Sequence, residues 1–259
     1  MSASITQAPS EDPRLRYVLR LADTSLILGQ RLSEWIGHAP ALEEDLGLAN
    51  IALDLIGQAR LLLSYAGELE GRGRSEDELA FLRDASEFLN LTLVEQPNGD
   101  FGHTLVRQLL LSAFQLEVYE ALQTCADSRL AEIAAKALKE TRYHVRYSAN
   151  WVVRLGDGTA ESHARVQAAL DELWPFTGEL FAEDGVDAAM VAAGSAPRAA
   201  ALKARWSARI DAVLAEATLI RPADSLFPWH GKRGVHTEHL GYMLAEMQFL
   251  QRAYPGAEW

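Results

Sequence analysis

The stretch Leu46-Gly47-Leu48-Ala49-Asn50-Ile51-Ala52-Leu53-Asp54-Leu55-Ile56-Gly57-Gln58 decides the fold. Wound as a helix, it carries apolar residues on nearly every side, which predicts a helix that is buried on most of its faces. Asn50, Asp54 and Gln58 recur every four residues and so form one stripe along that helix. Because buried polar groups are costly unless they are paired, the stripe predicts an interhelical hydrogen-bond network. The alternative is an inward-facing site, or the remnant of one.

Helical patterns extend in both directions from this segment. Apolar residues spaced three and four apart begin at about Pro13, and further helices are expected at about 41–67, 101–125, 128–155, 159–182, 197–217 and 235–253. A shorter helix follows Ser75, which has Glu78 three residues on, as a capping box requires. Residues 217–234 are expected to form a long ordered loop. Long helices without an alternating strand pattern predict an all-α bundle, with one domain over residues 13–259 behind a disordered leader at 1–12.

The composition narrows the class of partner. The chain has 259 residues and a formal net charge of −12, which disfavours binding to nucleic acid or to an anionic membrane. The only cysteine is Cys125, so no disulfide forms within the chain, as suits a reducing cytosol. The N-terminus lacks the basic start and apolar run of a signal peptide. No stretch approaches the roughly 20 apolar residues of a membrane span, and we expect a cytoplasmic protein.

A helical bundle with inward polar residues raises the question of a di-iron centre. Such a centre takes a Glu from each of two helices and a Glu-x-x-His motif from each of two others. The residue three before His144 is Thr141, and Glu140 is one position out of register. In the quoted helix the corresponding slot holds Leu55 and Gln58. Both motifs are therefore incomplete, and the sequence predicts no working metal cage.

Two further motifs lie near the C-terminus. The tract His236-Thr237-Glu238-His239 lacks the i, i+4 histidine spacing of a His-Glu-x-x-His zinc motif, so it is expected to serve helix capping and packing rather than metal binding. Just before it, Lys232 and Arg233 lie between two glycines. Two cations on flexible backbone at a helix start could bind a phosphate or a partner's carboxylates. The alternative is a solvated loop.

Several longer stretches carry a family resemblance. They are Arg31 to Pro40, Ala49 to Arg60, Leu93 to Gly99, Lys139 to His144, His236 to Gly241, and Ala245 to Gln248. In this order they resemble the C-subunit family of phenylacetyl-CoA 1,2-epoxidase complexes, and the likeness runs from about residue 14 to Trp259. A series of long motifs in order is far more specific than any single short pattern.

The resemblance implies a ferritin-like four-helix bundle with additional helices, acting as a non-catalytic structural subunit in aerobic phenylacetate breakdown. It implies a homologous catalytic subunit that holds the di-iron centre and most of the phenylacetyl-CoA, a reductase among the other subunits, and no cofactor in this chain. The chain in isolation could form a homodimer. By resemblance, degenerate ligand positions are Leu55, Gln58, Thr141, His144, Ser112 and, less clearly, Leu26.

The resemblance also points to surfaces. It places the loop that contains Asp187, Ala188, Ala189 and Met190 near the partner's substrate. For the partner contact we expect the region from Trp229 to Gly241 together with the C-terminal helix.

Two other functions stay open at this point. One is a stand-alone helical protein that binds an acyl-CoA. The other is a di-iron oxidase with atypical ligands, which would draw on acids outside the motif slots: Asp23, Asp54, Glu117, Glu120 and Glu140.

Overall fold

The computed structural model describes residues 12–257, and the predicted leader lies almost wholly outside this range. Within it the α-helices are α1 (Pro13–Glu34), α2 (Leu42–Glu70), α3 (Glu76–Phe81), α4 (Thr92–Glu95), α5 (Phe101–Leu122), α6 (Ser128–Gly156), α7 (Ala160–Leu173), α8 (Gly185–Ala192), α9 (Ala199–Glu216), α10 (Glu238–Met247) and α11 (Phe249–Ala253). Three short 3-10 helices are η1 (Ala85–Glu87), η2 (Trp174–Phe181) and η3 (Gly231–Arg233). No strand occurs among these residues, so the all-α prediction is confirmed.

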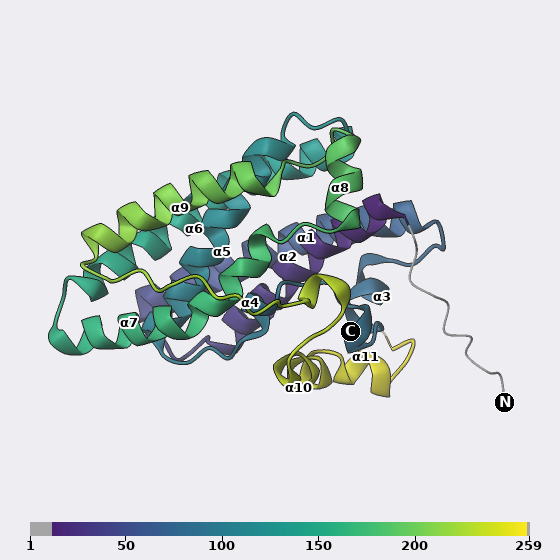
Figure 1. Cartoon of the computed structure of the whole chain (residues 1–259). Helices are drawn as coiled ribbons and strands as arrows, with labels where there is room; N and C mark the ends of the chain where they lie inside the picture. The colour runs from purple at the N-terminus through teal and green to yellow at the C-terminus, as the bar shows by residue number, and fades with distance from the viewer. Residues whose placement is uncertain (1–11, 258–259) are drawn as a thin grey trace.

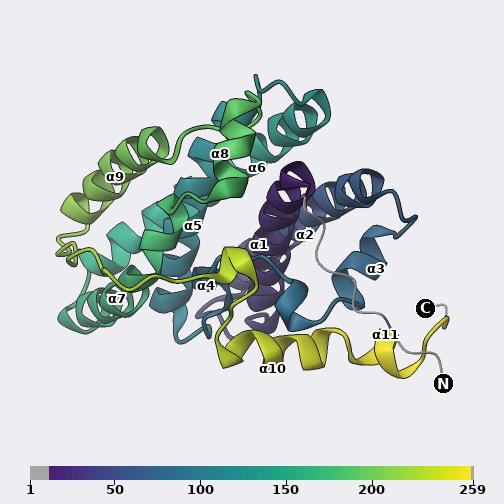
Figure 2. The ribbon, with the colours of Figure 1, turned by 45° about the vertical axis from the view of Figure 1, so that its right-hand side comes forward.

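Helices α1, α2, α5 and α6 form a four-helix bundle (Figure 1). Short connections join α1 to α2 and α5 to α6, which makes each pair antiparallel, and the 30-residue segment from 71 to 100 crosses between the pairs. Helices α7 and α9 pack on the α5–α6 side. Figure 2 shows α10 and α11 lying along the outside of the bundle, below α1 and α3. One long crossover between two helix pairs is one of the known bundle topologies.

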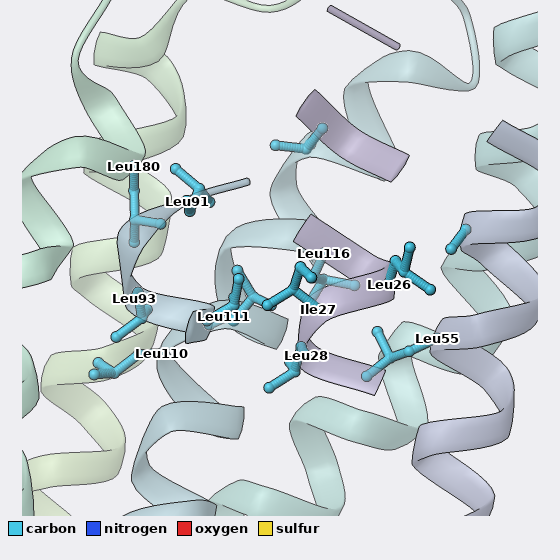
Figure 3. Close-up of a cluster of buried hydrophobic side chains, with 14 of the residues drawn as sticks. Leu26, Ile27, Leu28, Leu55, Leu91, Leu93, Leu110, Leu111, Leu116 and Leu180 are labelled. Carbon is cyan, nitrogen blue, oxygen red and sulfur yellow. The ribbon is translucent and has the colours of Figure 1, made fainter. Parts of the chain in front are cut away.

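The bundle interior is one contiguous apolar cluster that runs from α1 to α10. Figure 3 shows part of it, where Leu26 on α1 and Leu55 on α2 lie among leucines of α5. Two further leucines in the same view, Leu91 and Leu180, come from the crossover and from η2. The division into one domain over residues 13–259 stays a prediction.

The prediction that α2 is buried on nearly every side is wrong. Leu42, Leu46 and Leu53 are exposed, with Leu53 at 66%. By length and composition alone, α2 is the one helix among the described residues that could cross a membrane, and 44% of its most apolar window is buried inside the protein. Core helices of soluble proteins pass the same test. The structure therefore gives α2 a buried face against α1 and α6 and an outer face where exposed leucines lie among polar residues such as Asn50 and Arg60.

Local signals set most helix ends as predicted. The Ser75 capping box is present, with Glu78 bonded back to the Ser75 amide. Asp127 and Thr159 cap α6 and α7. The expected helix over 159–182 changes at Trp174 into a 3-10 helix, because Pro175 cannot continue the α-helical hydrogen bonds.

Candidate functional site

The positions predicted to be degenerate metal ligands on α2, α5 and α6 all lie inside the bundle. Leu55, Gln58, Ser112, Thr141 and His144 are each at most 2% exposed. Their side chains therefore project where the inward ligands of a metal-binding bundle would project. What each one does there is set by its hydrogen bonds.

Gln58 joins α2 to α5 and α6. Its Nε2 donates to Glu140 Oε2 at 2.9 Å, and its Oε1 accepts from the Tyr119 hydroxyl at 3.4 Å. Both ends of the amide therefore have partners. Burial raises the pKa of Tyr119 to about 12, so this phenol stays protonated and remains a donor.

His144 makes the second link between α2 and α6. Its Nε2 lies 3.0 Å from Asp54 Oδ2. Since a carboxylate only accepts, this nitrogen carries the proton, while Nδ1 is buried and has no partner among the described residues. The interhelical network predicted for the polar stripe thus forms at Asp54 and Gln58. Asn50, the third member of the stripe, is exposed and takes no part.

The two hydroxyls at degenerate positions turn back onto their own helices. Thr141 Oγ1 donates to the Ala137 carbonyl at 2.9 Å, and Ser112 Oγ donates to the Leu109 carbonyl at 3.5 Å. This is the usual way in which a buried Ser or Thr satisfies its hydroxyl inside a helix. Neither side chain is aimed at a shared point in the bundle.

Each of the acids outside the motif slots has its own partner. Asp23 pairs with Arg83, Asp54 with His144, Glu117 with Arg205 and Arg209, Glu120 with Arg142, and Glu140 with Gln58. Within residues 12–257 no three His, Cys, Asp or Glu side chains are arranged to hold a metal ion. A di-iron cage needs four carboxylates and two histidines, whereas the matched positions supply one imidazole and no carboxylate. These residues do not fit a di-iron centre.

The segment expected as a loop at Asp187 to Met190 is helical, which corrects that expectation. It belongs to α8, which begins because Asp184 accepts hydrogen bonds from the Val186 and Asp187 amides. Of the three residues predicted near a substrate, Met190 is buried, Ala189 is half-buried and Ala188 is exposed.

An ion-pair cluster fixes α8 against α1 and brings in Lys232. Arg20 lies 2.6 Å from Asp184 and 3.2 Å from Asp187, and Lys232 Nζ lies 3.2 Å from the same Asp187. Burial opposes ionisation of Asp184, but the hydrogen bonds and charge of Arg20 outweigh it and hold its pKa well below the usual range. Lys232 is thus engaged within the chain. Arg233, 3.4 Å from Asp184 and 55% exposed, is the freer of the two predicted cations.

Sequence reasoning missed Glu95, which docks the C-terminal helices. This fully buried carboxylate accepts from His236 Nδ1 at 2.8 Å and from the Thr237 amide and hydroxyl at 2.6 and 2.8 Å. Thr237 is the N-cap of α10, as its position suggested, and the carboxylate that holds this residue comes from α4, 142 residues away. Only the fold reveals this pairing, because nothing in the local pattern around Glu95 marks it.

Comparison with known proteins gives the family. A family model described as "Phenylacetic acid catabolic protein" matches residues 2–259. The chain belongs to the phenylacetic acid catabolic protein family. The C subunit of 1,2-phenylacetyl-CoA epoxidase from Escherichia coli (strain K12) is 53% identical over 243 residues, which cover 94% of this chain and 98% of the relative. The resemblance drawn from the motifs is confirmed.

A solved structure supports the fold assignment of this family member. A protein described as "Protein 19 with aldehyde deformylating oxidase activity from Synechococcus" superposes with a TM-score of 0.57 at 19% identity, covering 82% of this chain and 93% of that chain. At this identity the likeness concerns the fold alone. The fold is ferritin-like, as predicted.

Proposed function

We propose that this chain is the non-catalytic structural subunit of a multicomponent phenylacetyl-CoA 1,2-epoxidase. In this proposal it supports a homologous di-iron catalytic subunit during aerobic phenylacetate catabolism in the cytoplasm, and other subunits include a reductase. The observation that carries the proposal is the donor set inside the bundle, where Leu55, Gln58, Ser112 and Thr141 replace carboxylates and histidine. The 53% identity to a C subunit supplies the context.

The interior hydrogen bonds give the structural role a physical basis. In a di-iron bundle the metal ions tie the four helices together through their ligands. Here Gln58 and His144 tie α2 to α6 through Glu140 and Asp54, without any ion. A bundle held in this way keeps its shape independently of iron supply, which suits a subunit whose task is to present a fixed surface to a partner.

We propose the C-terminal face as the partner contact. It consists of the exposed apolar residues of α10, α11 and their flanks: Val235, Tyr242, Phe249, Leu250 and Tyr254. Tyr242 is 72% exposed, and aromatic residues are enriched at protein interfaces. Arg233 adds an exposed cation beside this face.

Metal analysis of the chain with and without its partner tests the role. The chain would be expressed with ferrous salt, alone and together with the catalytic subunit. Iron should follow the catalytic subunit, at about two ions per copy, and the ring-epoxidising activity should require both chains. About two iron ions in the isolated chain, with an oxo-bridge absorption band, would instead establish the di-iron oxidase alternative.

Calorimetric titration with phenylacetyl-CoA decides between the structural subunit and the stand-alone acyl-CoA-binding protein. Under the proposal the substrate is held mainly by the partner, so saturable binding should appear only with the complex. Binding of equal affinity by the isolated chain would favour the stand-alone alternative.

The surface proposal has its own test. Tyr242→Asp and Arg233→Glu should weaken co-purification with the catalytic subunit, since a charge would enter an apolar contact or a cation would be reversed. Lys139→Glu is the matched control, because Lys139 is exposed on α6, away from α10, and its charge change equals that of Arg233→Glu. Unchanged assembly of both test variants would exclude the C-terminal face.

A further inference from the structure

A cavity lies between α1 and α5 and is closed over by the chain from η2 to α9. Its inner part holds about 60 Å³, and the empty space reaches about 700 Å³ when the open mouth is included. Helix α8 packs on α1 and α9 packs on α5 (Figure 2). Neither the family relationship nor the interior hydrogen bonds of the bundle assign a use to it.

The walls of the cavity are mainly apolar. They are formed by Leu21, Leu91, Phe114, Val118, Leu180 and Leu202. Leu91 and Leu180 lie near each other at one edge of the core in Figure 3. Aromatic and branched aliphatic walls favour a ligand with a hydrocarbon body of similar shape.

Two polar side chains are among the residues that line the cavity. Gln115 on α5 is 4% exposed; its Nε2 donates to Ser25 Oγ at 3.2 Å, while its buried Oε1 has no partner among residues 12–257. Tyr17 on α1 also lines the cavity and is buried, and its hydroxyl has no hydrogen-bond partner among the same residues. Burial raises the pKa of Tyr17, so the phenol remains a donor.

The chemistry of these groups selects the polar part of a ligand. A buried amide oxygen without a donor is costly, and a ligand hydroxyl or amide N–H would satisfy it. If the oxygen and nitrogen of the Gln115 amide were exchanged, the atom without a partner would be the donor Nε2. A ligand hydroxyl or primary amide would satisfy that donor equally well, because each of these groups both donates and accepts. One such group on a ligand has the donor and acceptor chemistry that suits both Gln115 and Tyr17.

The charges at the mouth are already neutralised. Arg20 and Lys232 each lie 3.2 Å from Asp187, and Glu183 accepts from the Ala199 amide at 2.8 Å. Among the described residues that line the cavity, no free cation is left to hold a carboxylate or a phosphate. An uncharged ligand enters without breaking these pairs.

We propose that the cavity between α1 and α5 binds a small uncharged molecule with an aromatic or branched aliphatic body and a single hydroxyl or primary amide group. Its lining contains no degenerate ligand position and no residue of the C-terminal face, although Tyr119, the partner of Gln58, lines it. This site does not depend on the structural-subunit role.

Titration calorimetry of the full chain with three probes tests this ligand class. Benzyl alcohol should bind saturably at millimolar or lower concentration. Toluene lacks the hydroxyl and should bind about 10-fold more weakly, because the buried amide stays unpaired. Phenylacetate carries a charge and should also bind more weakly. Toluene binding as tight as benzyl alcohol binding, or no saturation by benzyl alcohol up to about 10 mM, would overturn the proposal.

Two variants locate the site, and one serves as a control. Tyr17→Phe should weaken benzyl alcohol binding about 10-fold, while Tyr242→Phe, the same change at an exposed position, should leave it unaltered. Leu21→Trp places a large ring into the cavity from a half-buried position and should abolish binding. Thermal melting of each variant verifies folding. Binding unchanged in both Tyr17→Phe and Leu21→Trp would place the ligand elsewhere and refute the assignment.

Discussion

The contact between His236 and Glu95 makes the docking of α10 dependent on pH. Both ring nitrogens of His236 face acceptors: Nδ1 lies 2.8 Å from Glu95 Oε2 and Nε2 lies 2.8 Å from the Phe88 carbonyl. Two acceptors require two donors, so the ring is an imidazolium. Burial lowers its pKa, but the hydrogen bond and charge of Glu95 outweigh burial and raise the pKa above its ordinary value.

The sign of the pH effect follows from this shift. A folded-state pKa above the unfolded value of about 6.5 means that the stabilisation is fully present below about pH 6.5 and is lost as the pH rises through the folded-state pKa. Hydrogen bonds to charged groups contribute roughly 1.5–3 kcal/mol. We therefore expect His236→Gln to lower the free energy of unfolding by roughly 2–3 kcal/mol at about pH 6, and by less at about pH 9.

Urea unfolding at several pH values measures this difference, and hydrogen exchange of the α10 amides reports whether the helix detaches first. His239→Gln is the matched control. It removes an imidazole from the same segment, and the His239 side chain makes no contact with Glu95. A difference between wild type and His236→Gln that stays constant from about pH 6 to about pH 9 would show that His236 is not held as a cation.

Three further substitutions test a buried ion pair, a close backbone contact and a strained backbone position. Asp23→Ala leaves the buried Arg83 without its carboxylate and should lower the free energy of unfolding by roughly 3–5 kcal/mol in urea titrations. Gly156→Ala would place a Cβ 2.4 Å from the Ala217 carbonyl and should cost roughly 1–3 kcal/mol by the same measurement. Thr218 has a φ of 57°, a region that Asn tolerates better, so Thr218→Asn should raise the melting temperature, consistent with a gain of about 1 kcal/mol.

The helix boundaries were predictable where short-range chemistry sets them. Ser75, Asp127 and Thr159 cap the helices that follow them, and each cap depends only on residues within a turn. Helix α8 was not predicted although Asp184 supplies a capping box with Asp187, because a helix of 8 residues is too short to show a clear apolar period. The burial of α2 was overestimated for a different reason: an apolar surface is not distinguished from an apolar core by composition.

The candidate site also has a part that the sequence could predict and a part that it could not. The spacing of Thr141 and His144 was enough to predict that the metal motif is incomplete. The actual partner of His144 was not predictable, since Asp54 is 90 residues away and depends on the register between α2 and α6. The cavity at Tyr17 and Gln115 needs three separate parts of the chain and leaves no local sequence signal.

Two of the fully buried carboxylates of this molecule share a setting. Ion pairs with a fully buried carboxylate occur where added segments meet the bundle: Asp23 with Arg83 at the crossover, and Glu95 with His236 at α10. Around Gln58 the interior bonds join its amide to a phenol and to the half-buried carboxylate of Glu140. An unpaired buried charge costs more than an unpaired neutral group, so each added segment is strongly penalised for docking in a wrong register. The bundle itself is aligned mainly by its apolar core.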